Sequence, residues 1–313
     1  MPATDSGPAD LGAVDLGPAN LPPAAGPPLP VGARLLRVDG TVLHVRCEGS
    51  GPVCVLSGGL GCAWFDWDAV AALLVPHRTV VRFDRPGYGL SASAAAAPTL
   101  RGEAERIRRI LSVLGLAGPA TVVGHSMAAF HVEAFARLHP ERTSAVVLVD
   151  GSTEPHARER PLPRARVRAA RLAAGVARGL AVPYLLGPPG RRLVVRLATA
   201  CGRDPAPRLL VRRCYRPWRA LRAALLENTC YRDQAAQLLV LRAELPLPAP
   251  VVVLAADDGS ASRRARRHRA RQRQLALALG GRLTVAAPSG HLLMLDRPEA
   301  VAAAVLTAND SAD

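Results

Sequence analysis

The sequence predicts an α/β fold: a mostly parallel, eight-stranded sheet flanked by helices. Short β-rich runs recur along the chain, and from residue 79 onward most are continuously apolar, as expected for strands buried on both faces. Helical stretches separate many of these runs, and such alternation is typical of a parallel sheet with right-handed crossovers. The chain has 313 residues, of which 49% are hydrophobic, so it is long enough to bury a sizeable core.

The predicted elements run in order along the chain. Strands are expected at 34–38, 41–47, 53–57, 79–83, 121–123, 145–149, 251–254 and 283–286. Helices are expected at about 65–75, 99–116, 127–138, 261–279 and 297–307. We therefore assign residues 33–151 and 249–313 to one α/β core.

Two segments lie outside this pattern. Residues 1–32 are rich in Pro, Gly and Ala without a hydrophobic period, so we expect a disordered leader. Residues 152–248 contain no clear strand, and their Pro-bounded helical pieces predict a helical insert before the seventh strand. This insert has 19 arginines against six acidic residues, and its net charge of +13 is most of the +15 of the whole chain.

Composition excludes several classes of protein. The residue balance does not fit a disordered, collagen-like or disulfide-stapled chain. All 40 basic residues are arginine, which with the abundance of Ala, Gly and Pro indicates bias toward GC-rich codons, so the high charge is a weak guide to function. The six cysteines form no Cys-x-x-Cys pair or zinc-type cluster, and free thiols predict a reducing, cytoplasmic compartment. No secretory signal is recognisable, and no apolar run is long enough to predict a membrane span.

The strongest local signal is the motif VVGHSMAA at 122–129, which follows an apolar strand and opens a helix. It has the form of a nucleophile elbow, G-x-S-x-G, with Ala128 in place of the final glycine. The tight turn holds Ser126 in a strained conformation, so Gly124 and Ala128 must leave room for the crossing backbone. The helix start then directs free N–H groups toward an anion formed on the substrate. An ordinary strand–helix turn with a chance serine is the alternative interpretation.

A glycine-rich loop, VLSGGLG at 55–61, follows another predicted strand. A serine nucleophile requires N–H donors for the tetrahedral oxyanion. The backbone N–H of Met127 can supply one donor and that of Leu60 the other. Gly59 lets the backbone approach the substrate oxygen closely.

A further motif, FDRPGYGLS at 83–91, ends another apolar strand. We assign it no chemistry. Its glycines turn the chain, and we expect Asp84 and Arg85 to hold this loop near the elbow by hydrogen bonds.

The segment PSGH at 288–291 follows the last predicted strand. A general base must reach the serine hydroxyl, and neutral histidine suits this role near neutral pH. His291 leaves a strand end on the same sheet edge as Ser126, although a surface histidine is the alternative. The other candidate histidines are less well placed. His44 lies within a predicted strand, and His131 and His139 lie on the helix after the elbow. His77 and His156 lie in loops without a motif, and His268 lies in an arginine cluster.

These motifs, in this order, resemble the α/β-hydrolase fold family. The resemblance covers about residues 33–307 and places the insert where the family has its helical cap. It implies that Ser126 is the nucleophile and His291 the general base, in the family's chain order of serine, acid and histidine.

The acid is less clearly marked. The family usually places it after the seventh strand, where this chain reads LAADDG at 254–259, without the glycine that commonly stands three residues before the acid. We take Asp258 as the acid, with Asp257 and Asp150 as alternatives. Asp150, at the end of the preceding strand, occupies a position that some members use.

A serine at the elbow limits the reactions that the protein could catalyse. Family members that open epoxides or displace halide use aspartate there, which leaves acyl transfer to water: Ser126 attacks an ester, thioester or amide carbonyl while His291 moves the proton. No cofactor and no metal are implied. The alternatives are a catalytically altered binding protein and a cofactor-free lyase, perhydrolase or acyltransferase of the same fold.

The charge of the insert limits the kinds of substrate and partner that we expect the protein to bind. The positive insert opposes a cationic substrate, so we expect a neutral or anionic small-molecule acyl substrate. The cluster RRARRHRARQR at 263–273 would suit nucleic acid by charge alone, but it lacks interleaved aromatic residues. A solvated helix face is favoured, and no specific nucleic-acid partner is expected.

Overall fold

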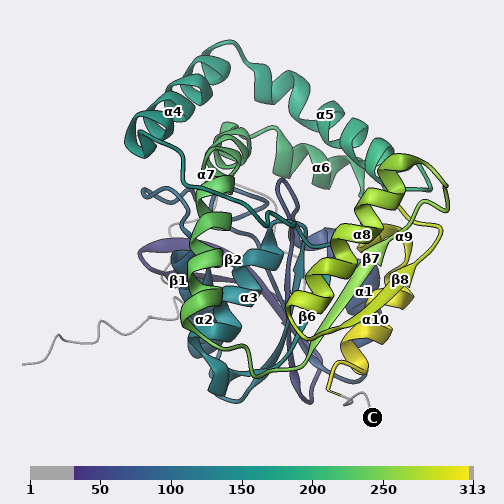
Figure 1. Ribbon diagram of the computed structural model, residues 1–313. Coiled ribbons are helices and arrows are strands. Elements are labelled where there is room, and N and C mark those ends of the chain that lie inside the picture. Colours follow the sequence, from purple (N-terminus) through teal and green to yellow (C-terminus); the bar gives the residue numbers. More distant parts are fainter. Residues whose placement is uncertain (1–31, 310–313) are drawn as a thin grey trace, which may run out of the picture.

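The computed structural model describes residues 32–309, and each strand and helix predicted for the core forms there (Figure 1). The predicted disordered leader lies outside the described residues, apart from its last residue. The elements, in chain order, are β1 (Ala33–Val38), β2 (Thr41–Glu48), β3 (Val53–Ser57), η1 (Trp64–Trp67), α1 (Asp68–Leu74), β4 (Thr79–Phe83), α2 (Leu100–Val113), β5 (Ala120–His125), α3 (Ala128–Leu138), η2 (Pro140–Arg142), β6 (Thr143–Val149), α4 (Pro163–Gly179), α5 (Val182–Ala198), α6 (Arg208–Tyr215), α7 (Trp218–Glu244), β7 (Val251–Ala256), α8 (Arg263–Ala278), β8 (Arg282–Ala286), α9 (Leu293–Asp296) and α10 (Pro298–Leu306).

The eight strands form one sheet in the order β1-β2-β4-β3-β5-β6-β7-β8. β2 pairs antiparallel with β1 and with β4, and every other pair is parallel, so the predicted mostly parallel sheet is confirmed. All residues of β5 and β7 are buried, as the continuous apolar runs indicated. The carboxyl ends of the parallel strands therefore meet at one edge, where open α/β sheets bind ligands.

Helices cover both faces of the sheet. α2, α3 and α8 share one apolar cluster with the sheet, which contains Ile107, Phe135 and Leu275. α1 and α10 cover the other face through Val70 and Val301. Each fully buried side chain of this size stabilises the fold by about 2 kcal/mol, so both layers are substantial.

The helical insert, α4–α7, lies between β6 and β7 as predicted. α4 and α5 form an arch that stands away from the sheet, with α6 and the start of α7 below it (Figure 1). Among the described residues, no single helix is long and apolar enough to cross a bilayer; α4 and α5 together reach that length and composition but bend by 101° between them.

α7 departs from the expectation of an insert that is only a cap. Its 27 residues run from the cap down to the core, where Leu238 and Leu241 join the apolar cluster of α2 and α3. Arg242 also pairs with the buried Glu133 of α3 at 2.7 Å. The second half of α7 therefore belongs to the core, and only the first half faces the cap.

Candidate active site

Ser126 stands in a tight turn between β5 and α3. Its φ is +53°, a left-handed conformation that residues other than glycine rarely adopt. The backbone N–H of Ser126 donates a hydrogen bond to the Val149 carbonyl at 3.1 Å, which holds the turn in this conformation. A Cβ at Gly124 would lie 2.5 Å from the Ala128 carbonyl oxygen, so only glycine fits where the helix crosses the strand. The methyl group of Ala128 is buried without such a clash. The strained serine turn expected from the motif is therefore present.

Three side chains converge at the carboxyl edge of the sheet. His291 Nε2 lies 2.9 Å from Ser126 Oγ, and His291 Nδ1 lies 2.6 Å from Asp150 Oδ2. Ser126 follows β5, Asp150 follows β6 and His291 follows β8, so strand ends supply all three. The structure thus brings together the predicted serine and histidine with one of the two alternative acids.

The prediction that Asp258 lies beside His291 is wrong. Asp258 is fully exposed and accepts a hydrogen bond from the Ser260 N–H at 2.8 Å. Asp257, the other alternative, pairs with Arg269 at 2.7 Å. The loop after β7 directs both carboxylates away from the histidine, whereas the backbone of Asp150, at φ +45°, turns its side chain toward it.

Asp150 is buried and accepts hydrogen bonds from three sides. Its Oδ1 receives the Ala256 N–H at 2.9 Å and lies 2.7 Å from His268 Nε2, while Oδ2 faces His291. Burial by itself would raise the pKa of the Asp150 carboxyl, but the bonds from His268 and His291 hold that pKa below its ordinary value. The carboxylate is therefore ionised at every pH at which a histidine base works.

His268 is a site residue that the sequence reasoning missed, because its arginine-rich surroundings resembled a solvated helix face. It shares one face of α8 with the buried Ala265 and Gln272, at spacings of three and four residues. Gln272 also donates to the Gly151 carbonyl at 2.8 Å, so this face holds the backbone that follows Asp150. The available sequence signal was the helical spacing of Ala265, His268 and Gln272, which places His268 on the buried face of the helix.

Replacing His268 by Gln tests its contact with Asp150. The hydrogen bond to Asp150 raises the pKa of His268, although partial burial opposes this. A raised folded-state pKa stabilises the fold fully below the unfolded pKa of about 6.5, and this contribution is lost as the pH rises through the folded-state value. The melting-temperature advantage of the wild type over His268→Gln should therefore shrink as the pH rises from about 5.5 to 9. An advantage that is constant with pH would contradict a charged His268.

The glycine-rich loop approaches the elbow closely. A Cβ at Gly59 would lie 2.8 Å from Ser126 Cβ and 2.8 Å from His125 Nδ1, so this position requires glycine. Within residues 32–309, the backbone N–H groups of Leu60 and Met127 donate no hydrogen bond. Both predicted oxyanion donors are therefore available for a substrate oxygen.

Arg85 and Asp84 hold the loops around the elbow, as expected. Arg85 donates to the Gly58 carbonyl and, at 2.8 Å, to the Gly59 carbonyl. Its guanidinium also pairs with the buried Glu227 of α7 at 2.6 Å. Asp84 accepts the Trp64 N–H at 3.0 Å. The buried Arg85–Glu227 ion pair thus helps to tie the insert to the glycine-rich loop.

His125 was noted only as part of the elbow motif, but it also supports His291. Its Nε2 lies 2.9 Å from the His291 carbonyl, which can only accept, so Nε2 carries the proton. Burial, with the neighbouring His291, lowers the pKa of His125 to about 3. His125 is therefore neutral and positions the backbone of the base.

An apolar cavity of about 430 Å³ lies beside the glycine-rich loop, under the arch. Leu60 and Leu292 line it from the core, and Leu186 and Val194 line it from α5. Among the described residues that line it, Arg191 alone is charged, and its guanidinium is bound by two carboxylates, Asp66 and Asp204, and by the Tyr215 hydroxyl. The cavity thus presents an apolar wall that includes Leu60 and Leu292, and Leu292 directly follows His291 in the chain.

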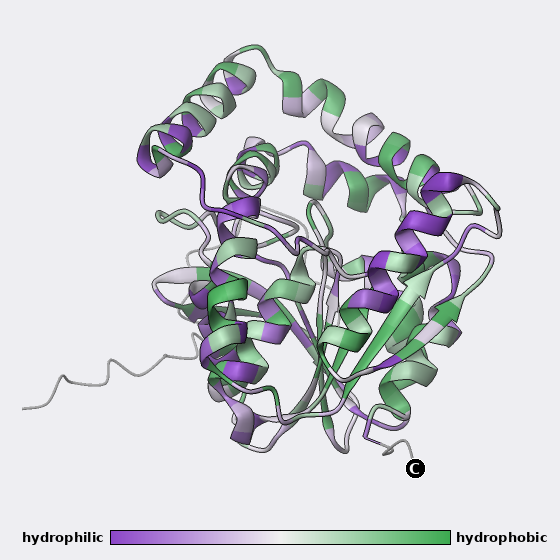
Figure 2. Cartoon of the chain, in the orientation of Figure 1, coloured by the Kyte–Doolittle hydropathy of each residue, from purple (hydrophilic) through white to green (hydrophobic). Residues whose placement is uncertain are grey.

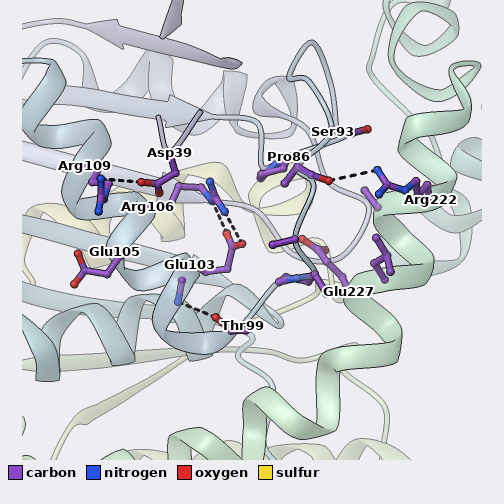
Figure 3. A pocket seen from close by; sticks show the side chains of 17 residues that line it. Asp39, Pro86, Ser93, Thr99, Glu103, Glu105, Arg106, Arg109, Arg222 and Glu227 are labelled. Atoms are coloured by element: carbon purple, nitrogen blue, oxygen red, sulfur yellow. Dashed lines mark hydrogen bonds and ion pairs between the residues drawn. The ribbon is translucent and has the colours of Figure 1, made fainter. Parts of the chain in front are cut away.

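A second cavity, of about 370 Å³, lies between α2, α7 and the loop at 93–99 (Figure 3). Two ion pairs join charged side chains of its lining: Arg109 contacts Asp39 at 2.8 Å and Arg106 contacts Glu103 at 3.2 Å. Ser126, Asp150 and His291 line neither this cavity nor the apolar one. The apolar cavity adjoins the reactive groups through Leu60, which follows Gly59 of the glycine-rich loop, and through Leu292, which follows His291 in the chain.

The comparisons identify the family of the chain. Residues 53–304 match the model of the Alpha/beta hydrolase family, and the chain belongs to that family. Epoxide hydrolase B of Mycobacterium tuberculosis is 33% identical over 121 residues, which cover 36% of this chain and 34% of that protein. The chain thus matches about a third of this curated relative's length.

Solved structures extend the similarity to most of the chain. Cfl2 from Burkholderia cenocepacia superposes with a TM-score of 0.70 at 22% identity, covering 88% of this chain and 94% of that chain. A thermophilic esterase from Thermogutta terrifontis gives a TM-score of 0.64 at 21% identity, covering 85% and 92%. At these identities the structures show the shared fold.

Proposed function

We propose that the protein is a serine hydrolase that cleaves neutral, apolar carboxylic esters through Ser126, His291 and Asp150. The observation that carries this proposal is the continuous chain of hydrogen bonds from Ser126 Oγ through the His291 ring to Asp150, at 2.9 Å and 2.6 Å. Membership of the Alpha/beta hydrolase family supports a hydrolytic reaction.

In the first half of the reaction, Ser126 Oγ attacks the ester carbonyl carbon while His291 Nε2 takes the hydroxyl proton. The oxyanion accepts the N–H groups of Met127 and Leu60, and each such donor is worth about 3 kcal/mol in the transition state. The intermediate then collapses, and His291 returns the proton to the departing alcohol.

In the second half, water attacks the acyl-serine with His291 again as base, and Ser126 leaves with the proton. Asp150 accepts no proton in either half, because its pKa is held below its ordinary value. Its negative charge stabilises the imidazolium that forms twice in each cycle.

Epoxide opening fits Ser126 poorly, although relatives with that activity match this chain. A carboxylate nucleophile that opens an epoxide forms an ester, which water can hydrolyse. A serine alkoxide would form an ether instead, and neither His291 nor the oxyanion donors can cleave it. The enzyme would stop after one turnover.

The cavity supports a neutral substrate rather than the anionic one that the insert's charge also allowed. Arg191 is the charged lining residue, and Asp66 and Asp204 already neutralise it. A substrate anion would have to compete with two carboxylates for one guanidinium. An aliphatic chain, in contrast, gains about 0.8 kcal/mol for each methylene that it buries against the apolar lining.

The test is a panel of p-nitrophenyl esters varied in acyl length, with a parallel panel of methyl to octyl alcohol esters. Purified protein should hydrolyse them and should react covalently with a fluorophosphonate probe at Ser126. Binding without turnover or labelling would favour a catalytically altered binding protein. Labelling together with acyl transfer to an added alcohol or peroxide, in preference to water, would favour an acyltransferase or perhydrolase.

Ala224→Phe should shift the chain-length preference. Ala224 of α7 lines the apolar cavity, and a phenyl ring there removes space that a chain would occupy. We expect kcat/KM for an octanoyl ester to fall about tenfold or more while the acetyl ester changes less than about threefold. Val240→Phe, at an exposed site lower on the same helix, is the matched control. Equal losses of kcat/KM for both esters would show that the acyl chain of the substrate does not bind in the apolar cavity.

A further inference from the structure

We propose that the outward face of the α4–α5 arch is a docking surface for an anionic lipid bilayer. Six large apolar side chains on this arch are each between 56% and 77% exposed: Leu172, Val176, Leu180, Leu185, Leu193 and Leu197. Most exposed large apolar side chains of the described residues lie in the insert, and Figure 2 shows hydrophobic and hydrophilic residues interleaved along the arch.

The exposed residues form stripes rather than a scatter. On α4, Leu172, Val176 and Leu180 follow one another at four-residue spacing, on the side opposite the buried Ala170 and Ala174. On α5, Leu193 and Leu197 lie four residues apart and stand opposite Arg191 and Val195, which are buried, while the exposed Leu185 lies toward α6. Each helix therefore buries one narrow face and leaves an apolar face without a partner among the described residues.

Charge identifies the kind of partner. Residues 163–198 contain eight arginines and no acidic residue. Codon bias accounts for arginine in place of lysine, but it does not account for the absence of Asp and Glu over both helices. Arg164 and Arg168 continue the apolar stripe of α4, are exposed, and pair with no described residue. A helix with leucine and arginine on its outward face matches the boundary between acyl chains and anionic headgroups.

Other occupants fit less well. Nucleic acid would neutralise the arginines but leave the leucines exposed. A second copy of this chain, packed arch to arch, would bring the exposed Arg164 and Arg168 of each α4 against those of the other copy. The 101° bend and the arginines also oppose a helix pair that crosses the bilayer, and favour helices lying in its surface.

Docking would place the substrate cavity against the lipid. Leu186 and Val194 of α5 line that cavity and are 61% and 60% exposed, so the same helix forms a cavity wall and the proposed docking face. This consequence rests on the proposed esterase function. Docking itself does not, and it is measured without turnover.

The test is co-sedimentation of the 313-residue chain with vesicles of phosphatidylcholine alone and with vesicles containing about a third phosphatidylglycerol. The arch variant carries Arg164→Gln, Arg168→Gln and Leu172→Ser. The matched control carries Arg263→Gln, Arg267→Gln and Leu277→Ser on α8, which removes the same charge and one exposed leucine elsewhere. Thermal melting and fluorophosphonate labelling of Ser126 verify that each variant is folded.

The wild type should bind the anionic vesicles and bind the neutral ones more weakly. The arch variant should lose at least about tenfold in affinity, and the α8 control should stay within about twofold. Equal losses in both variants, or none in the arch variant, would overturn the proposal. So would a wild-type dimer that the arch variant dissociates, or vesicle binding that occurs only after residues 1–31 are removed, since these outcomes assign the arch to a second copy or to the chain's own leader.

Discussion

Asp150→Asn should lower the turnover of an activated ester by about ten-thousand-fold, the loss seen when the acid of a serine-protease triad is replaced by its amide. The orientation of the new amide explains why a loss of turnover of this size is expected. The Ala256 N–H needs an acceptor at the position of Asp150 Oδ1, so the amide oxygen stays there. The amide NH₂ then occupies the position of Oδ2 and faces His291 Nδ1.

An NH₂ group at that position selects the wrong tautomer of the base. His291 Nδ1 would have to accept a hydrogen bond, so its proton would move to Nε2, which faces Ser126 Oγ. A protonated Nε2 cannot take the serine proton. The substitution also removes the negative charge that stabilises the imidazolium.

Asp258→Asn and Asp257→Asn are the matched controls, since they make the same chemical change one strand away. Asp258 is exposed and Asp257 pairs with Arg269, whereas His291 bonds to Asp150, so both variants should keep turnover within about threefold of the wild type. The measurement is initial rate at a saturating concentration of a p-nitrophenyl ester, with melting temperature as the folding control. A crippled Asp258→Asn beside an active Asp150→Asn would reverse the assignment of the acid.

Ser126→Ala should abolish turnover, with a loss of about a million-fold on the precedent of other serine triads. Alanine keeps the size of the side chain and shares the backbone preference of serine, so the melting temperature should change little. Ser126→Gly should be equally inactive but more stable, by about 1 kcal/mol, because glycine adopts the φ of +53° without strain.

Together, Ser126→Ala and Ser126→Gly separate the role of the Ser126 hydroxyl in the reaction from the backbone strain at this position. Active-site titration with a fluorophosphonate, ester turnover and thermal melting are measured for both. Residual activity above about a tenth of the wild type in either variant would remove Ser126 from the reaction. A destabilised Ser126→Gly would show that the elbow is held by its side chain rather than strained by it.

Most of the core was predictable because its signals are local. A parallel strand buried on both faces must be continuously apolar, and β5, β6 and β7 carry runs of that kind. The elbow was predictable for a similar reason, since only Gly124 fits beside the crossing helix. α7 was harder to assign, because one continuous helix serves the cap at its start and the core at its end.

The acid was not predictable with the same certainty, because β6 and β7 are neighbours whose ends lie side by side. Val149 pairs with Leu254, so Asp150 and the two aspartates after β7 all leave the sheet close to the same point. Which carboxylate meets His291 depends on the turn at Asp150 and on the face of α8 that carries His268. Neither is encoded in a short motif.

The sequence by itself determined the parallel α/β core, the strained serine and the histidine after the last strand, because each depends on residues that are adjacent in the chain. The tertiary structure decided which aspartate completes the hydrogen-bond chain, that His268 and His125 support it, and that Arg164, Arg168 and the apolar stripe of α4 are exposed. The hydrogen-bond chain and its supports depend on contacts between residues more than a hundred positions apart, such as His268 with Asp150 and His125 with His291. Long-range packing, rather than local pattern, places such groups.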